Sequence, residues 1–190
     1  MSNISIIGIR HGEAIHNVLY DRIGTDAFTQ FQDTSLTTQG MLQALEARRK
    51  VPRIDVVLVS PLMRTLQTAS VIFPGVKMIA LDELMEYPQN VEICNRRSSI
   101  DDLSKLFPHV DFSRTSENDG FGVKNADTHL EKQTIKFNKI LKSFTPDTNK
   151  IAIVSHSTWL KNYINGTIGD IYQELPHCEP LPIVVTNKIL

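Results

Sequence analysis

Five short apolar runs are spread along the chain, and they constrain its fold more than any other feature. They cover residues 4–9, 55–60, 76–81, 151–155 and 181–185. Runs of this length, rich in valine and isoleucine and without alternating polar residues, are typical of strands buried on both faces of a parallel sheet. Each run therefore predicts a strand that helices cover on both sides.

The segments between these runs carry apolar residues at helical spacing. The predicted helices cover residues 37–50, 61–73, 127–144 and 157–166. Strands that alternate with helices along the chain predict an α/β fold. We expect a three-layer α/β/α sandwich with a mostly parallel central sheet.

Residues 87–126 do not follow this alternation. Within them, residues 98–107 are typical of a short helix, with Ser99 and Asp102 placed as a capping box at its start. A length of 190 residues suits one domain. We therefore expect a single domain over residues 1–190, with residues 87–126 as a flap over the ligand site.

In an open parallel sheet, ligands bind beyond the carboxyl ends of the strands. Three loops of this chain directly follow predicted strands and carry polar or cationic side chains. These loops hold Arg10 and His11, Ser60 to Arg64, and Ser155 and His156. We expect the three loops to converge on one crevice.

The overall charge is close to neutral, with 20 lysines and arginines against 21 aspartates and glutamates. It gives no basic field that would attract a nucleic-acid polymer. Two cysteines without metal-ligand spacing indicate a reducing compartment, and the apolar run at residues 4–9 is too short for a signal peptide or a membrane span. We expect a soluble cytoplasmic protein with no membrane partner. If the chain associates with itself, a homodimer is the commonest arrangement.

Arginine and histidine side chains at strand ends are suited to binding a phosphoryl group. A guanidinium group donates two parallel hydrogen bonds to phosphate oxygens and stays charged. Arg10 and Arg64 fit this role, and the backbone N–H of Ser157, at a predicted helix start, is a further donor. The sequence holds neither a cluster with metal-ligand spacing nor a glycine-rich G-x-x-x-x-G-K loop. We therefore expect arginines and a histidine to supply the positive charge, with no metal and no cofactor.

Five motifs along nearly the whole chain resemble those of one protein family. RHGEAIHN (10–17) resembles an R-H-G-E-x-x-x-N signature, and DTSLTTQGMLQA (33–44) resembles a D-x-x-L-T-x-x-G-x-x-Q-A segment. VSPLMRTLQTA (59–69), LME (84–86) and VSHSTWL (154–160) resemble further segments in the same order. Together they are similar to the histidine phosphatase superfamily, in its phosphoglycerate mutase-like branch.

The resemblance implies a phosphoryl-transfer mechanism and gives roles to five residues. His11 is implied as the nucleophile that takes the phosphoryl group, which requires a neutral ring with a free nitrogen lone pair. His156 is implied as a charged or hydrogen-bond-donating partner that stabilises the transferring group. Arg10 and Arg64 are implied to hold the non-bridging oxygens, and Asn17 to contact the phosphate.

A carboxyl group is implied as the acid that protonates the leaving oxygen and later activates water. Glu86 and Glu83 both stand in an L-x-E pattern, 22 and 19 residues after Arg64. The family places this glutamate a little over twenty residues after the arginine, which favours Glu86. Glu83 stays open as the acid or as a substrate contact.

Arg96 and Arg97 lie in residues 94–112, which are similar to the arginine-bearing flap of an outlying subgroup of the family. In the mutases of the family, an arginine pair in the flap binds a second anionic group of the substrate. The resemblance therefore implies substrate binding by Arg97. For Arg96, a solvated basic patch beside Asp101 is an equal alternative.

The resemblance leaves three functions open. A phosphatase passes the phosphoryl group from the histidine to water, whereas a mutase returns it to another hydroxyl group. The short chain lacks the longer insert of the cofactor-dependent mutases, which favours a phosphatase with a small phosphorylated substrate. A non-catalytic module that binds a phosphorylated ligand is the third alternative, and the presence of the full set of catalytic residues argues against it.

The remaining histidines and the tryptophan are interpreted from their surroundings. His16 either lines the pocket or lies on the surface. His109 and His177 are expected to be ordinary surface or cap residues, and Trp159 to belong to the core.

Overall fold

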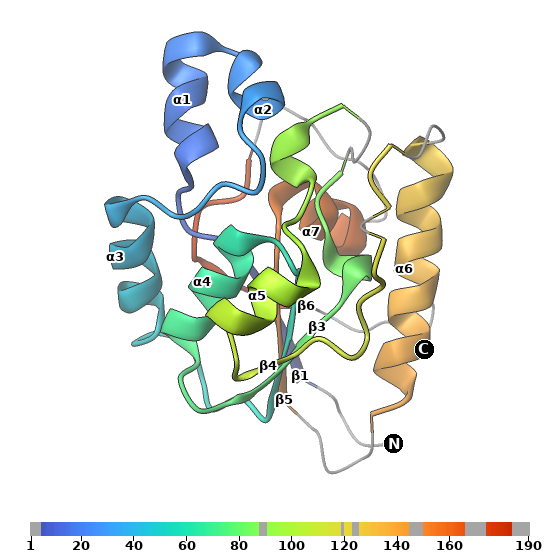
Figure 1. Ribbon diagram of the computed structural model, residues 1–190. Coiled ribbons are helices and arrows are strands. Elements are labelled where there is room, and N and C mark those ends of the chain that lie inside the picture. The colour runs from blue at the N-terminus through green and yellow to red at the C-terminus, as the bar shows by residue number, and fades with distance from the viewer. Residues whose placement is uncertain are drawn as a thin grey trace.

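A computed structural model describes residues 5–87, 91–118, 120–122, 126–144, 150–165 and 174–183. Within these residues the centre of the fold is a six-stranded sheet with the order β4-β3-β2-β5-β1-β6 (Figure 1). The strands from β4 to β1 in this order run parallel, and β6 pairs with β1 in the antiparallel direction. The strands are β1 (Ser5–Arg10), β2 (Val56–Val59), β3 (Lys77–Ala80), β4 (Val110–Asp111), β5 (Lys150–Ser155) and β6 (Pro180–Ile183).

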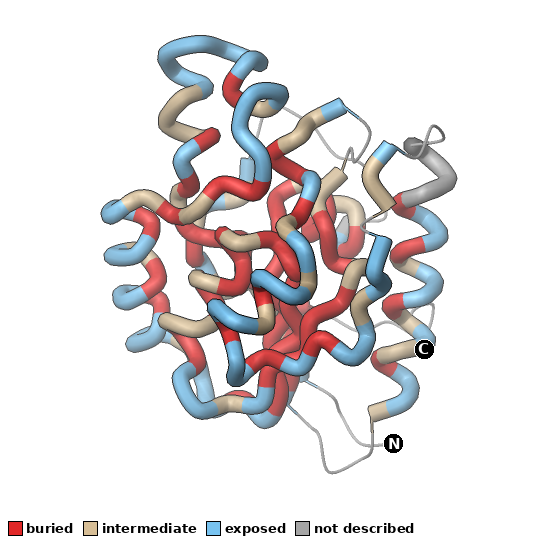
Figure 2. Tube along the Cα trace, viewed as in Figure 1, coloured by how far each residue is buried: buried red, intermediate tan, exposed pale blue. Residues whose placement is uncertain are grey.

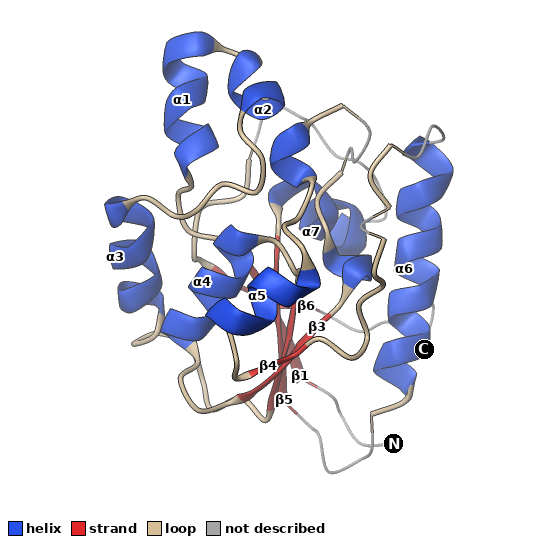
Figure 3. Ribbon diagram, viewed as in Figure 1, coloured by secondary structure: helices blue, strands red, loops and turns tan. Residues whose placement is uncertain are grey.

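Helices cover both faces of this sheet, so the fold is the predicted three-layer sandwich (Figures 1 and 3). One layer holds α3 (Thr38–Ala47), α4 (Met63–Ile72) and α5 (Ile100–Leu106); the other holds α6 (Ala126–Lys142) and α7 (Ser157–Asn165). Two further helices, α1 (Ile15–Ile23) and α2 (Asp26–Gln30), lie beyond the end of the sheet where β1 ends. Two 3₁₀ turns are η1 (Asp82–Leu84) and η2 (Ile93–Asn95). None of the described helices combines the length and the apolar character needed to cross a membrane.

The central strands are buried on both faces, as their uninterrupted apolar runs predict (Figure 2). In β2, Val57 and Val59 belong to the core beneath α3, α4 and α5, whereas Val56 and Leu58 belong to the core beneath α6 and α7. Because side chains alternate across a strand, one four-residue strand contributes to both cores. Trp159 is fully buried in the second core, which confirms its prediction as a core residue.

The five predicted strands are confirmed as β1, β2, β3, β5 and β6, although the last one runs antiparallel. Residues 184–185 of the last prediction lie outside the described residues. The predicted helices are confirmed as α3, α4, α6 and α7, with α3 ending at Ala47 rather than at residue 50. The pattern did not predict α1 and α2, because α1 exposes much of its apolar surface and so lacks a clean buried stripe.

Residues 98–112 form part of the sandwich, although they lie within the segment interpreted as a flap. The short helix α5 begins after Ser99, whose Oγ accepts a hydrogen bond from the Asp102 N–H at 3.1 Å, as the predicted cap requires. Leu103 and Phe107 are buried in the core beneath α3, α4 and α5, and β4 pairs with β3 at the edge of the sheet. Among the described residues of the segment, those that line the cavity described below all precede α5.

Gly12 and Gly40 allow the loop after β1 to pack directly against the start of α3. A Cβ atom at Gly40 would lie 2.1 Å from the carbonyl oxygen of Glu13, and one at Gly12 would lie 2.5 Å from that of Gly40. Thr37 holds the same contact, because its Oγ1 accepts from the Gly40 N–H at 3.0 Å and its N–H donates to the Glu13 carbonyl at 2.9 Å. This packing supports the loop that carries His11.

Replacing Gly40 with alanine is expected to destabilise the protein by about 1–3 kcal/mol, because the new methyl group collides with backbone that no side-chain rotation can move. The gain in helix propensity, about 1 kcal/mol at most, offsets only part of this cost. Denaturant unfolding of the variant measures the effect, with exposed Gln39→Ala on the same helix as the control. A Gly40→Ala protein as stable as the control would contradict the close contact.

Candidate active site

A cavity of about 260 Å³ lies at the carboxyl ends of β1, β2 and β5. Arg10 at the end of β1, His11 directly after it, and Arg64 and Ser157 in the first turns of α4 and α7 all contribute to its wall. The segments that follow β1, β2 and β5 therefore converge on one cavity, as predicted, and His156 lies beside His11. The lining residues are Arg10, His11, His16, Asn17, Phe28, Arg64, Glu86, Tyr87, Glu92, Cys94, Asn95, Ser157, Thr158 and Glu174.

A larger hollow, of about 650 Å³, lies at the opposite end of the sheet, where β2 and β3 begin. Its wall includes Arg53, Asp55, Pro74 and Lys77 but no histidine. The combination of histidines, arginines and carboxyl groups therefore makes the smaller cavity, beyond the carboxyl ends of the strands, the candidate active site.

His11 is buried, and its hydrogen bonding fixes which ring nitrogen is free. Its Nδ1 lies 2.7 Å from the carbonyl oxygen of Gly12. Because a carbonyl oxygen only accepts, Nδ1 carries the proton and Nε2 of the neutral ring carries the lone pair. Burial lowers the pKa of His11 well below its usual value, and the charges of Arg64 and Arg10 lower it further. The ring is therefore neutral at physiological pH, with Nε2 able to act as a nucleophile.

His156 lies beside His11, with 5.2 Å between the two ring centroids. Its Nε2 is 2.8 Å from the Oγ of Ser60, which follows the neighbouring strand β2. Its Nδ1 is buried and finds no hydrogen-bond partner in the described part of the chain. Burial and the charge of Arg64 lower the pKa of His156, so a neutral ring that forms hydrogen bonds is favoured over a cation.

Two buried arginines face the same cavity. Arg10 donates from Nη1 to the Leu175 carbonyl and from Nη2 to the Glu174 carboxylate, each at 2.5 Å. Arg64 donates from Nη1 to the Cys94 carbonyl and from Nη2 to Asn95 Oδ1, each at 2.8 Å. The Nε atoms of both arginines are buried and lack a hydrogen-bond partner among the described residues. Because buried donors are nearly always satisfied, this wall is chemically suited to an anion.

The position of Arg64 is set by Asp33, a residue buried between two loops. Asp33 Oδ1 accepts from the Met63 N–H at the first residue of α4, and its Oδ2 accepts from the Ser98 N–H, both at 2.7 Å. In the same helix, Thr68 Oγ1 accepts from the Gly12 N–H at 3.0 Å. The helix that carries Arg64 is thus tied both to the loop of His11 and to the segment before α5.

Glu86 lies against the first turn of α7. Its Oε2 accepts from the Thr158 N–H at 3.2 Å, and its Oε1 accepts from the Trp159 N–H at 3.1 Å and the Tyr87 N–H at 2.9 Å. Burial raises the pKa of Glu86, although these hydrogen bonds and the charge of Arg64 oppose the shift. A cavity-lining carboxyl group with a raised pKa is suited to general acid catalysis.

Comparison with known proteins identifies the family. The family model of the histidine phosphatase superfamily (branch 1) matches residues 6–182. The chain belongs to this superfamily. Phosphoglycerate mutase-like protein 1 of Arabidopsis thaliana is 28% identical to it, over 95% of this chain and 80% of that protein. Phosphoglycerate mutase-like protein of Arabidopsis thaliana is 25% identical, over 95% of this chain and 83% of that protein.

Solved structures share the fold of this superfamily member at lower identity. The ecdysone phosphate phosphatase of Bombix mori, solved with tungstate, has a TM-score of 0.71 and 16% identity, over 94% of this chain and 88% of that one. A phosphoserine phosphatase mutant of Entamoeba histolytica has a TM-score of 0.63 and 21% identity, over 97% of this chain and 92% of that one. At these identities the similarity concerns the fold.

Glu83, the alternative candidate for the acid, lies on η1 and is not part of the cavity wall. Its backbone carbonyl accepts from Trp159 Nε1 at 2.7 Å, which ties it to the core side of α7. Its Oε2 is buried without a hydrogen-bond partner among the described residues. Of the two glutamates, the geometry therefore favours Glu86 as the acid.

Asn17 and Ser157, both predicted to contact the substrate, line the cavity. Asn17 Oδ1 accepts from the Ala14 N–H at 2.9 Å at the start of α1, so its amide nitrogen remains as the group that can donate to a ligand. Ser157 is the first residue of α7, and its Oγ accepts from the Leu175 N–H at 3.0 Å. These contacts fix one atom of each side chain against the protein.

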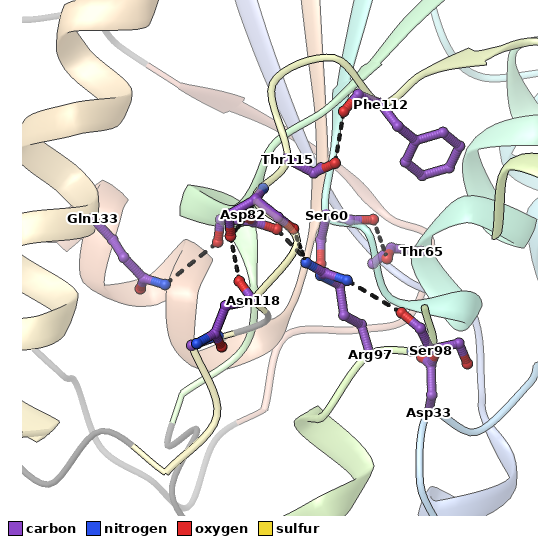
Figure 4. Close-up of polar contacts among 12 residues, drawn as sticks. Asp33, Ser60, Thr65, Asp82, Arg97, Ser98, Phe112, Thr115, Asn118 and Gln133 are labelled. Atoms are coloured by element: carbon purple, nitrogen blue, oxygen red, sulfur yellow. Dashed lines mark hydrogen bonds and ion pairs between the residues drawn. The ribbon is translucent and has the colours of Figure 1, made fainter. Parts of the chain in front are cut away.

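Arg97 lies outside the cavity wall and is held by protein acceptors (Figure 4). It forms an ion pair with Asp82 (Nε to Oδ1, 3.4 Å) and donates to the backbone carbonyls of Ser98 and Ser116. Arg96 is exposed and stacks over the Phe121 ring at 5.6 Å. The expected arginine pair thus does not lie in the cavity, because Asp82 engages Arg97 and Arg96 points to the surface.

Sequence reasoning gave no clear role to three titratable residues of the cavity wall, His16, Glu92 and Glu174, and placed a fourth residue next to the site, His177, on the surface. His16 is buried and lines the cavity, with Nδ1 2.5 Å from Thr34 Oγ1. Glu92 and Glu174 also line it, and neither belongs to a motif that the sequence made visible. His177, expected on the surface, is half-buried beside His11 and donates from Nδ1 to the His11 carbonyl at 2.7 Å. No local pattern in the sequence indicates this contact, because it joins residues 166 positions apart. In the described part of the chain, no group of three His, Cys, Asp or Glu side chains could hold a metal ion.

Proposed function

We propose that this chain is a phosphatase that hydrolyses a small phosphomonoester through a phosphohistidine on His11. The observation that carries the proposal is the neutral His11 ring, with its Nε2 lone pair free, in one cavity with Arg10 and Arg64. The fold of this superfamily member, shared with a phosphoserine phosphatase and an ecdysone phosphate phosphatase, supports it.

In the first step, His11 Nε2 attacks phosphorus and the bond from phosphorus to the ester oxygen breaks. Arg10 and Arg64 hold the non-bridging oxygens while charge shifts toward the leaving group. Protonated Glu86 gives its proton to the leaving oxygen, so that an alcohol departs rather than an alkoxide. His156 contributes a hydrogen bond to the transferring group.

In the second step, the Glu86 carboxylate takes a proton from water as the water oxygen attacks phosphorus. The bond from phosphorus to Nε2 breaks, which releases inorganic phosphate and restores neutral His11. The enzyme ends in its starting protonation state, with Glu86 protonated again.

The charges in the cavity favour a phosphatase over a mutase. A phosphoglycerate-type mutase must hold a second anionic group beside the phosphate. The arginine pair expected for this role lies elsewhere: Arg97 pairs with Asp82 and Arg96 stacks on Phe121. The cavity itself carries Glu92 and Glu174 instead.

The test is hydrolysis of p-nitrophenyl phosphate with excess chelator, with and without a phosphorylated hydroxy acid as an acceptor. We expect turnover that survives the chelator and releases inorganic phosphate in equal amount to the phenol. Transfer to the acceptor in preference to water would instead indicate a mutase. A protein that neither turns over nor forms a phosphoryl adduct would be a binding module.

The pH profile of the wild-type protein provides a second prediction. Because the protonated form of Glu86 is the acid, kcat/KM for an alkyl phosphate is expected to fall as pH rises through its raised pKa. The lowered pKa of His11 means that no loss of activity is expected on acidification through about pH 6.5, where an ordinary histidine is protonated. The profile is obtained by measuring kcat/KM at each pH across the acid and neutral range and dividing each value by the measured fraction of ionised substrate. A corrected kcat/KM that rises as pH increases through about 6.5, the ordinary histidine pKa, would contradict a neutral His11.

A further inference from the structure

The cavity wall carries more carboxyl groups than arginine side chains. Besides its histidines, the wall carries two arginines, Arg10 and Arg64, and three carboxyl groups, Glu86, Glu92 and Glu174. The proposed function gives both arginines to the phosphoryl group and Glu86 to the leaving oxygen. Glu92 and Glu174 are then left facing the rest of the substrate.

Next to the lining residues in the sequence, the further arginines are Arg96 and Arg97, which follow Asn95, and neither lines the cavity. Arg96 is exposed and stacks over the Phe121 ring. Residues 88–90 and 166–173, which adjoin lining residues in the chain, contain no lysine, arginine or histidine. Arg97 is engaged by Asp82 and by two backbone carbonyls. A substrate with a second anionic group would therefore meet like charge beyond the phosphate, and such contacts oppose binding.

Glu92 is held at the wall by a chain of hydrogen bonds that starts at Arg64. Arg64 Nη2 donates to Asn95 Oδ1 at 2.8 Å, and Asn95 Nδ2 donates to Glu92 Oε2 at 3.0 Å. Burial raises the pKa of Glu92 to about 7, and the neighbouring Glu86 adds to the shift. A cation beside Glu92 favours its ionised form and relieves this cost, since an opposite charge stabilises a carboxylate.

Glu174 lies on the other side, at the mouth. Its carboxylate reaches Arg10 at 2.5 Å while 63% of its side chain remains exposed. When a phosphoryl group takes Arg10, Glu174 stays at the mouth as an unpaired anion. Phe28 and Tyr87 also line the cavity and present aromatic rings, whose faces attract cations.

We propose that the substrates of this enzyme are phosphomonoesters of amino alcohols, whose ammonium group is received by Glu92 and Glu174 while Arg10 and Arg64 hold the phosphate. This inference rests on the proposed phosphatase function and adds its substrate class. The volume of about 260 Å³ suits a leaving group of only a few heavy atoms. With the ammonium bound, each charge of the substrate meets a side chain of opposite charge.

Three phosphate esters of nearly equal size test this class: O-phosphoethanolamine, propyl phosphate and 2-phosphoglycolate, which end in an ammonium, a methyl and a carboxylate group. We expect kcat/KM to fall in that order, by about tenfold at each step, as partly buried ion pairs and like-charge contacts predict. Glu92→Gln and Glu174→Gln are each expected to reduce the preference for the ammonium ester. Glu131→Gln, exposed on α6, is the matched control and is expected to keep it.

Binding of phosphonates, which cannot be hydrolysed as phosphate esters are, tests the substrate class independently of the proposed phosphatase activity. By calorimetry, 2-aminoethylphosphonate is expected to bind about tenfold more tightly than propylphosphonate, and Glu92→Gln to reduce the difference. Equal affinities, with His11-dependent turnover of all three esters, would overturn the substrate class and leave the phosphatase intact. Tighter binding of the amine in a protein that hydrolyses no ester would overturn the phosphatase and support the ligand class.

Discussion

Replacing His11 with alanine is expected to reduce the turnover of p-nitrophenyl phosphate by at least about 10³-fold, because a reaction that proceeds through a covalent intermediate loses its nucleophile. The wild-type protein, quenched during turnover, is expected to carry a phosphoryl group that acid removes and alkali does not, as bonds from phosphorus to histidine nitrogen require. The variant is expected to carry none. Mass spectrometry of the quenched proteins measures both.

His109→Ala is the matched control for this experiment. His109 is exposed and forms a hydrogen bond through Nε2 with Ser70 Oγ at 2.9 Å, and neither residue lines the cavity. The control is expected to keep both turnover and adduct. Thermal unfolding of both variants shows whether they fold. A folded His11→Ala protein that retained turnover or adduct would remove His11 from the mechanism.

Much of the fold could be predicted from the sequence, because the signals that determine it are local. The strands are continuous runs of buried aliphatic residues, and such a run indicates a strand buried on both faces without any information from distant residues. The caps of α3 and α5 at Thr37 and Ser99 are equally local. By contrast, β4 has only two residues and joins the sheet through its pairing with β3, which no short pattern reveals.

The site residues also fall into two groups, those that local motifs locate and those that depend on contacts between distant segments. His11, Arg10 and Arg64 stand at fixed distances from strand ends, so a motif and the rule for parallel sheets locate them together. Glu92 reaches the cavity through Asn95 and Arg64, and Glu174 reaches it through Arg10 across 164 residues. The sequence cannot give such contacts, because they depend on how separate loops meet. Arg97 shows the converse: its charge matched a ligand-binding pattern, but Asp82 is its partner.

Replacing Glu86 with glutamine is expected to reduce kcat/KM for an alkyl phosphate by about 10²–10⁴-fold, the usual range for loss of a general acid. For p-nitrophenyl phosphate, whose leaving group needs little protonation, the loss is expected to be much smaller. The ratio of the two effects is the measurement, since a structural defect lowers both rates alike. Glutamine retains an oxygen that accepts from the first turn of α7, so the variant is expected to fold.

Glu83→Gln distinguishes the two candidate acids. Glu83 lies three residues earlier and carries the same carboxyl group, but it contacts the core side of α7 and not the cavity. Its glutamine variant is expected to treat alkyl and aryl phosphates as the wild type does. If Glu83→Gln instead lost the alkyl phosphate selectively while Glu86→Gln did not, the acid would be Glu83. The carboxylate of Glu86, held by the N–H groups of Thr158 and Trp159, would then serve to anchor α7 beside the phosphate.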